Sequence, residues 1–179
     1  MNIQTKRLIL QEITWEDLED IHWLHSFPEV DEFNTLGIPE NLEDTKKVMQ
    51  STINDQKAEK RREIQWSIRL IEEKTFIGLA GMRVSEERFK MAEIFYKLAP
   101  LHWGKGYGTE VAKRLISFGF DTLMLHRIEA GTATENKKSI SILEKAGMKR
   151  EGIRRKILPI RGQWYDNYQY AILEDDPRL

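Results

Sequence analysis

The sequence predicts an α/β fold built around one mixed sheet, and two observations lead to this prediction. The hydrophobic pattern changes repeatedly between the 3.6-residue period of amphipathic helices and the alternation of half-buried strands. The predicted elements follow in the order β-α-α-β-β-β-α-β-α-β-β, in which helices interrupt the strands as in α/β domains. A length of 179 residues suits one domain over residues 1–179, and 40% hydrophobic residues are enough for its core.

The first third of the chain is predicted to contain one strand and two helices. Residues 3–11 are rich in leucine and isoleucine and form the strand. Thr14 begins the first helix, because its hydroxyl can accept a backbone N–H and two acidic residues follow in the first turn. Residues 26–41 contain two prolines and a glycine, which indicates a loop. Asn41 then caps a polar helix that continues to about Lys60.

The middle of the chain predicts an antiparallel meander of three strands. Residues 64–70 alternate between apolar and polar side chains, as a half-buried strand does. Residues 72–74 form the turn to a second strand over 75–84, whose two glycines indicate a bulge or a close backbone approach. A third strand covers residues 92–98 and is ended by Pro100.

The last third alternates helices and strands. Residues 106–122 have the spacing of an amphipathic helix, and residues 127–134 form a strand after it. Residues 136–146 form another helix with its apolar side chains on one face. Residues 148–155 and 164–173 are the two final strands.

The composition excludes several classes of function. The formal net charge of -1 favours neither nucleic acid nor an anionic membrane as a partner. The absence of cysteine excludes disulfides, a thiol nucleophile and cysteine-ligated metal sites, and it is compatible with the cytoplasmic location that we expect. We expect no metal site either, because His22 and His25 share a helical spacing but lack a third ligand.

The most informative segment is a glycine-containing loop between a strand and a helix. Three of the 11 glycines fall at positions 104, 106 and 108, directly before the helix. Glycines let the backbone curl without a Cβ atom, so that N–H groups point into a concavity at the positive end of the helix. Such a concavity binds anions and suits a diphosphate best, and Lys105 adds a mobile positive charge.

The glycine loop alone leaves the ligand open. A phosphate-binding P-loop requires Gly-Lys followed by Ser or Thr, which is absent from this segment. The dinucleotide-binding pattern requires a glycine where this chain has Thr109. A tight connection between two elements, with no ligand at all, is a further alternative.

Other segments narrow these alternatives, because four motifs stand in order along the chain. They are the opening residues 5–10, the strand 92–98 with the loop 104–110, the helix region 136–148, and the segment 162–166. Together they resemble the GCN5-related N-acetyltransferases, the GNAT superfamily. The first and last motifs resemble the RimJ/RimL-like branch, which contains the ribosomal-protein alanine N-acetyltransferases.

The resemblance implies a mixed, mostly antiparallel sheet, flanked by helices, with a V-shaped splay between its central strands. Acetyl-CoA would lie in this splay as the co-substrate, and no metal is implied. Its pantetheine arm would contact the main chain of Tyr96, Leu98 and Pro100 and the side chain of Asn136. Its diphosphate would be held by the loop and the helix start: Trp103, Gly104, Lys105, Gly106, Tyr107, Gly108 and Thr109.

The resemblance also implies direct transfer of acetyl to an amine, which must first lose a proton. Glu93 matches the family's general base, acting through water, although it could instead be a sheet-face carboxylate paired with a neighbour. The backbone amide of Leu98 would stabilise the oxyanion. Many relatives protonate the departing thiolate with a tyrosine where this chain has Leu143, whereas Ser139 matches the serine of this branch.

We therefore expect an N-acetyltransferase whose acceptor is a protein N-terminus or, second, a polyamine or other small amine. The acceptor wall should come from residues 15–35 and the loop 156–165, and a homodimer is expected because relatives are often dimers. Leu143 and Leu158, which replace acidic groups of relatives, support an alternative: a non-catalytic acyl-CoA binding or sensing module. An ordinary nucleotide-binding module is a third hypothesis.

Overall fold

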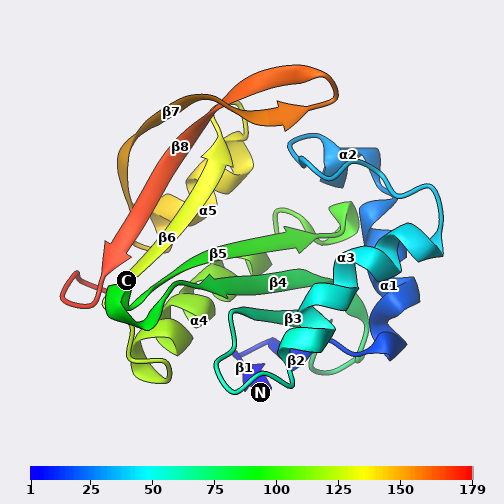
Figure 1. The fold of residues 1–179 in the computed structure, drawn as a ribbon, viewed down its shortest axis with the longest axis horizontal. Coiled ribbons are helices and arrows are strands. Elements are labelled where there is room, and N and C mark those ends of the chain that lie inside the picture. The colour runs from blue at the N-terminus through cyan, green and yellow to red at the C-terminus, as the bar shows by residue number, and fades with distance from the viewer. Residues whose placement is uncertain (179) are drawn as a thin grey trace.

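An eight-stranded sheet in the order β1-β2-β3-β4-β5-β6-β8-β7 forms the centre of the computed structural model, which describes residues 1–178. Neighbouring strands run antiparallel except β5 and β6, which are parallel. Helices lie on both faces, with α4 and α5 behind the sheet and α1 and α3 in front of it (Figure 1). The predicted fold class, α/β with a mixed and mostly antiparallel sheet, is confirmed.

The N-terminal segment forms two strands, so the prediction of one strand over residues 3–11 is wrong. β1 (Ile3–Gln4) pairs antiparallel with β2 (Leu8–Glu12). The chain reverses at Thr5, whose N–H donates to the Leu8 carbonyl at 2.9 Å and whose hydroxyl accepts from the Leu8 N–H at 2.9 Å. A hydrophobic pattern does not reveal such a turn, because both strands carry the same leucine and isoleucine residues.

The predicted helix starts are confirmed, whereas one predicted helix end is wrong. Thr14 caps a short 3-10 turn, η1 (Trp15–Asp17), that leads into α1 (Leu18–His25). Asn41 caps α3 (Leu42–Asp55) by accepting from a backbone N–H of its first turn. α3 ends at Asp55 and not near Lys60, because the Asp55 carboxylate accepts from the next strand's first N–H groups and turns the chain back.

The segment predicted as a loop over residues 26–41 contains one more short helix, α2 (Pro28–Asp31). Pro28 occupies its first position, where a missing N–H costs nothing. The predicted meander is confirmed as β3 (Glu63–Leu70), β4 (Phe76–Val84) and β5 (Met91–Leu98). A 3-10 turn, η2 (Glu87–Phe89), lies between the last two strands.

The remaining elements follow the predicted order. They are η3 (Pro100–His102), α4 (Tyr107–Asp121), β6 (Arg127–Ala133), α5 (Lys137–Lys145), β7 (Lys149–Ile160) and β8 (Gln163–Leu173). β7 is longer than the predicted strand 148–155 because an irregularity between Arg154 and Leu158 interrupts the pairing with β8 without ending it. The β7–β8 hairpin therefore extends beyond the sheet toward α2 (Figure 1).

The two parallel strands separate soon after they meet. β5 pairs with β6 only from Met91 to Glu93, opposite Arg127 to Glu129, although both strands continue for several residues. Figure 1 shows their far halves diverging. The predicted V-shaped splay between the central strands is confirmed, and β4 stays paired with β5 along the whole length of this arm.

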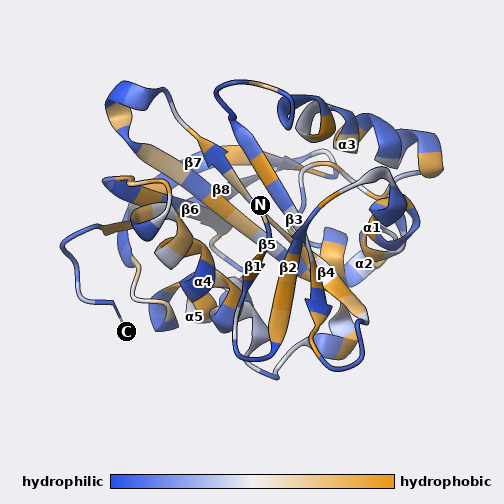
Figure 2. Cartoon of the chain, turned by 90° about the horizontal axis from the view of Figure 1, so that it is seen from below, coloured by the Kyte–Doolittle hydropathy of each residue, from blue (hydrophilic) through white to orange (hydrophobic). Residues whose placement is uncertain are grey.

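Two apolar clusters hold the layers together. One lies between the sheet and α4 and contains the fully buried Trp66 and Leu115. The other joins α1, α3 and the opposite face through Ile21, Met49 and Leu79. α3 contributes few of these side chains and is largely hydrophilic (Figure 2). No helix within residues 1–178 is both long and apolar enough to cross a membrane.

Candidate active site

The backbone of β5 turns one edge toward the splay. Ala99 donates its N–H to the Ile77 carbonyl of the β4 side at 2.9 Å. Backbone groups of successive strand residues point to opposite edges, so the N–H and C=O groups of Tyr96 and Leu98 point away from β4 and into the splay. The sequence predicted main-chain contacts at these two residues, and the strand orientation makes both available there.

Trp103 anchors the start of the glycine loop to the end of β5. Its indole N–H donates to the Leu98 carbonyl at 2.7 Å, and its backbone N–H donates to the Pro100 carbonyl at 3.1 Å. These bonds occupy both carbonyls and leave the Leu98 N–H facing the splay. Pro100 has no N–H and its carbonyl is occupied by Trp103, so its main chain cannot make the contact with the pantetheine arm that the sequence predicted. Lys138 of α5 lies with its Nζ 3.9 Å from the Trp103 ring centre and brings a cation to the loop.

The glycine loop has the backbone conformation that the sequence predicted. Gly104 and Gly106 have φ values of 74° and 82°, in the left-handed region that other residues rarely adopt. Gly106 is the N-cap of α4 and supplies no side-chain cap, so the first N–H groups of the helix, from residues 107–109, stay open at its positive end. Lys105 is exposed between the two glycines. This arrangement can hold a diphosphate.

Arg7 and Glu110 fix this loop, and the sequence assigned neither a role. The Arg7 guanidinium donates to the Lys105 carbonyl at 3.0 Å and to Glu110 Oε2 at 2.7 Å. It also lies 4.4 Å from the centre of the Tyr107 ring. Burial opposes ionisation of Glu110, but hydrogen bonds from Thr5 and Arg7 hold the pKa of this carboxyl below its ordinary value. Arg7 belongs to the opening motif, residues 5–10, and its place in that motif was the sequence feature that could have indicated this role.

Tyr96 and Ser139 meet across the splay. The Tyr96 hydroxyl oxygen lies 3.3 Å from Ser139 Oγ, which joins β5 to the first turn of α5. Asn136 is the N-cap of α5 and accepts from the Ser139 N–H at 3.1 Å, so its side-chain oxygen has a structural partner while its amide group can still donate. Burial raises the pKa of the Tyr96 phenol, although the hydrogen bond with Ser139 opposes the rise. Leu143 is buried in the core.

Glu93 lies where the splay begins. Its strand partners are Arg83 in β4 and Glu129 in β6, and its side chain is exposed. Among residues 1–178, the acidic neighbour Glu129 is paired with Arg127, whereas Glu93 makes no ion pair, so the alternative role as a paired sheet-face carboxylate has no partner there.

A buried basic cluster lies on the opposite face of β5, toward α1 and α2. Lys97 Nζ is 3.3 Å from His25 Nε2 and 3.2 Å from Asn34 Oδ1. Burial is the main reason that the pKa of Lys97 is lowered to about 8; Asp31 opposes this change and Arg83 adds to it. Burial, together with the nearby Lys97 charge, lowers the pKa of His25 to about 3. The sequence analysis did not identify Lys97, although a lysine within a half-buried strand could have indicated a buried cation.

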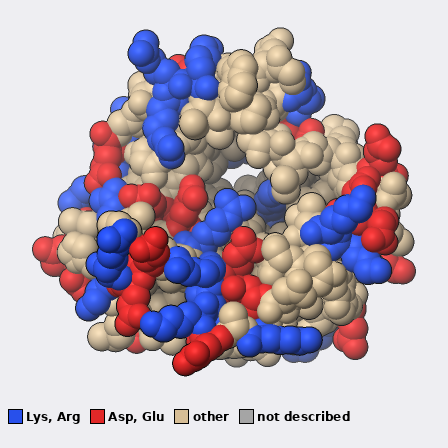
Figure 3. Space-filling model, in the orientation of Figure 1, with Lys and Arg blue, Asp and Glu red and all other residues tan. Residues whose placement is uncertain are grey.

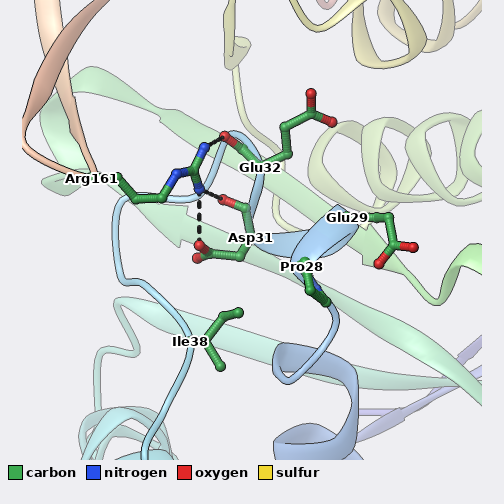
Figure 4. A pocket seen from close by; sticks show the side chains of 6 residues that line it. All are labelled: Pro28, Glu29, Asp31, Glu32, Ile38 and Arg161. Atoms are coloured by element: carbon green, nitrogen blue, oxygen red, sulfur yellow. Dashed lines mark hydrogen bonds and ion pairs between the residues drawn. The ribbon is translucent and has the colours of Figure 1, made fainter.

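The β7–β8 hairpin closes over this face. Arg161 at its tip donates to the Asp31 carboxylate and carbonyl, both at 3.0 Å, and to the Glu32 carbonyl at 2.7 Å (Figure 4). A hollow of about 360 Å³ lies at this contact. Figure 3 shows an opening below the hairpin. The two segments proposed as the acceptor wall, residues 15–35 and 156–165, therefore meet.

The two histidines of α1 have different partners. His22 Nδ1 lies 2.8 Å from Thr45 Oγ1, whereas His25 faces Lys97. Among residues 1–178 no three histidine, cysteine, aspartate or glutamate side chains gather as metal ligands would. The histidine pair thus serves contacts of α1 with α3 and β5.

The splayed sheet and the open helix start beside it define an acyl-CoA-dependent transferase. The family model described as "Acetyltransferase (GNAT) domain" matches residues 7–149, and the chain belongs to this family. The predicted family is confirmed.

Relatives and solved structures agree with this assignment. An uncharacterized N-acetyltransferase of Bacillus subtilis, YoaA, is 33% identical over 96% of both chains. A GNAT-family acetyltransferase structure from Bacillus anthracis has a TM-score of 0.86 at 30% identity and covers 98% of this chain and 100% of its own. Spermidine N-acetyltransferase from Vibrio cholerae, solved with CoA and spermine, has a TM-score of 0.83 at 25% identity, covering 94% and 96%. The ribosomal protein uS5 alanine N-acetyltransferase of Escherichia coli is 31% identical over 59% of this chain and 55% of its own.

The chain is therefore an acetyl-CoA-dependent N-acetyltransferase that acts on an amine. This confirms the predicted enzyme class and excludes the ordinary nucleotide-binding module as its main function. The non-catalytic acyl-CoA module was motivated by two missing acidic groups, and the family assignment favours catalysis over it.

Proposed function

We propose that the acceptor is the α-amine at the N-terminus of a protein or peptide. The relatives divide between two acceptor classes by their names, a ribosomal protein in Escherichia coli and spermidine in Vibrio cholerae. The choice between these classes depends on the charges at the acceptor face. The position of Lys97 is the observation that carries the proposal.

Lys97 disfavours a polycation. Its ammonium group has only neutral partners within hydrogen-bond distance, His25 of α1 and Asn34. The charge of Asp31 raises the pKa of Lys97, but Arg161 already pairs with that carboxylate. A polyamine would place further ammonium groups against Lys97, whereas a peptide presents a single amine followed by carbonyl groups that can accept hydrogen bonds.

The basicity of the acceptor supports the same choice. An N-terminal α-amine has a pKa of about 7.7–8.0, so about one tenth of it is neutral at pH 7. An alkyl amine with a pKa of about 10.4 is neutral to less than about one part in a thousand. Glu93, at the start of the splay, is exposed and acts best on an amine that gives up its proton easily.

The proposed reaction is a direct attack in a ternary complex. The open N–H groups at the start of α4 hold the diphosphate of acetyl-CoA, with Lys105 and Lys138 as nearby cations. Glu93 removes the ammonium proton through water, and the Leu98 N–H stabilises the oxyanion of the tetrahedral intermediate. A cytoplasmic location and a homodimer remain predictions of the sequence.

A comparison of three amine acceptors tests which acceptor class the enzyme prefers. CoA release should be measured with a lysine-free peptide that begins with alanine, with an N-terminally blocked peptide that contains one lysine, and with spermidine. We expect kcat/KM for the free α-amine to exceed the other two by about 100-fold, which corresponds to about 2.7 kcal/mol. A preference for spermidine would contradict the proposal and favour the polyamine class.

The variant Lys97→Met tests the reason for this preference. Removing the buried cation should raise kcat/KM for spermidine relative to the peptide, by about tenfold. The exposed Lys145 supplies a matched control, since Lys145→Met removes the same charge at a distance from the acceptor face. An equal change in both variants would show that net charge, and not Lys97, sets the preference.

A further inference from the structure

The amine of Lys97 lies on the acceptor face, next to the backbone groups that are expected to hold the thioester. Lys97 stands between Tyr96 and Leu98 in β5, and the Leu98 N–H proposed for the oxyanion belongs to the peptide bond that follows Lys97. Side chains alternate along a strand, so the Lys97 side chain shares the face of Phe95, which packs with the apolar cluster of α1. An amine of the chain itself therefore lies on the side from which the acceptor must attack.

Two hydrogen-bond acceptors hold this amine in place. Lys97 Nζ lies 3.3 Å from His25 Nε2 and 3.2 Å from Asn34 Oδ1, and the Lys97 side chain is half-buried. A neutral lysine amine carries two N–H bonds and one lone pair. When the N–H bonds point to Asn34 and to His25, whose own proton is then on Nδ1, the lone pair points away from both of them, as a nucleophile requires.

We propose that the enzyme acetylates its own Lys97 when acetyl-CoA is bound and no acceptor occupies this face. Lys97 is then a modification site, and His25 and Asn34 are the residues that position its amine. The inference rests on the acetyl-CoA site of the proposed function but not on the class of acceptor. The modified side chain is a neutral amide, so the cation that disfavours polyamines is lost.

The bonds and protons of this transfer balance. The neutral Lys97 amine attacks the thioester carbon, so that a nitrogen–carbon bond forms while the carbonyl electrons move to oxygen. The carbon–sulfur bond then breaks, its electron pair stays on sulfur, and the carbonyl group reforms. The proton that the nitrogen loses passes through water to the thiolate. Amine and acetyl-CoA thus give acetyl-lysine and CoA, with no other reactant.

The surroundings of Lys97 favour a reactive amine. Burial is the main reason that its pKa is lowered to about 8, while Asp31 of α2 opposes this change and Arg83 of β4 adds to it. About one tenth of the amine is therefore neutral at about pH 7, whereas an ordinary lysine with a pKa of about 10.4 is neutral to less than about one part in a thousand. His25 of α1 stays neutral in this range, because burial lowers its pKa to about 3. The rate of modification should rise with pH up to about 8 and level off above it, since Lys97 loses its proton there.

Peptide mapping by mass spectrometry, after incubation with acetyl-CoA and no acceptor, measures the modification. We expect acetyl groups to accumulate on Lys97 about 100-fold faster than on the exposed Lys145 at about pH 8, at a rate independent of protein concentration. Excess CoA should suppress acetylation of Lys97 but not of Lys145, because only Lys97 reacts with the bound thioester. Equal rates at the two lysines, or acetylation of Lys97 that CoA does not suppress, would overturn the proposal.

The pH profile of Asn34→Asp tests whether the neutral amine is the reacting form. A carboxylate beside Lys97 keeps the amine protonated, so self-acetylation at about pH 8 should fall about tenfold and level off at a higher pH than in the wild type. Asn54→Asp is the matched control, because it adds the same charge at an exposed position of α3 and should leave the rate unchanged. A wild-type pH profile in Asn34→Asp would contradict the proposal.

The absence of an acceptor in these experiments separates the inference from the proposed function. A preference for spermidine would contradict the proposed acceptor class and would leave self-acetylation of Lys97 intact. An enzyme that acetylates peptides while its Lys97 stays unmodified would overturn the inference alone. Lys97→Arg keeps the positive charge and removes the reactive amine, so this variant should no longer consume the roughly one equivalent of acetyl-CoA per chain that the wild type consumes without acceptor. Consumption at the wild-type rate in Lys97→Arg would assign the reaction to another group and overturn the proposal.

Discussion

Gly106 has a left-handed backbone at the start of α4, where a side chain would meet both strain and ligand. Its φ is 82°, and a Cβ atom there would lie 3.4 Å from the Arg7 guanidinium. We expect Gly106→Val to abolish the stabilisation by CoA, because Val is strained in this conformation and its methyl groups would fill the diphosphate site. The measurement is the shift in melting temperature over a series of CoA concentrations.

Gly37 provides the control for backbone strain alone. Its φ is 78° and no atom lies within 4 Å of a Cβ placed there, so Gly37→Val should lower stability similarly without touching the loop. CoA should stabilise this variant as much as the wild type. Undiminished stabilisation of Gly106→Val would instead remove the diphosphate from the glycine loop.

The sequence predicted single residues well where their role is local. The glycines, the Asn136 cap and the Thr14 cap depend on neighbours within a few positions, and the structure has them as predicted. Arg7 and Lys97 were missed, because their partners stand about a hundred and about seventy positions away along the chain. Spacing rules contain no information about such pairs.

At the scale of elements, the turn between β1 and β2 supports the loop before α4 through Arg7. The guanidinium bonds Lys105 and Glu110, which lie on either side of the first open N–H groups. We expect Arg7→Ala to weaken CoA binding by about tenfold, because the loop loses the contact that fixes its curvature. Isothermal titration with CoA measures this change.

Arg114 provides a control for Arg7, because it also joins α4 to the N-terminal strands. It donates to the Gln4 carbonyl at 3.0 Å, but it lies away from the loop. Arg114→Ala should keep the CoA affinity of the wild type. If both variants bind CoA equally well, Arg7 has no part in ordering the loop.

The β7–β8 hairpin and α2 act as a pair of elements joined by Arg161. We expect Arg161→Ala to raise KM for the acceptor about tenfold and to leave the KM for acetyl-CoA unchanged, because the contact borders only the acceptor side. Steady-state kinetics with both substrates varied measure the two constants. Arg155→Ala, on the exposed part of β7, should change neither constant. A rise in both constants would show that the hairpin also shapes the CoA site.

The sequence predicted the order of the main elements but neither their exact number nor their docking. Alternating patterns revealed β3, β4 and β5, whereas the hairpin's length and the α2 helix depend on contacts that form only in the folded chain. The splay itself came from the family resemblance and not from periodicity. Residue patterns do not state where two parallel strands stop pairing.

At the scale of the whole molecule, the two faces of the sheet differ in character. The face under α4 is an apolar core, and shortening a fully buried side chain such as Leu115 to alanine would cost about 2–5 kcal/mol. The face under α1 and α2 buries ionisable groups, His25 and Lys97, beside the acceptor opening. Stability and pH are therefore coupled through the same face that binds the acceptor.

His25 makes the fold sensitive to acid. Its pKa is lowered from 6.5 to about 3 by burial and by Lys97, so the unfolded chain binds more protons between these two values. Stability should therefore fall as the pH drops from about 6.5 toward 3, by up to about 1.4 kcal/mol per pH unit from this group. We expect His25→Gln to flatten this part of the profile, because the amide does not titrate and can still accept from Lys97.

Urea unfolding between pH 3 and 7 measures the slope of stability against pH, with the exposed His126→Gln as the control. An equally steep profile in His25→Gln would assign the acid sensitivity to carboxylates elsewhere in the chain.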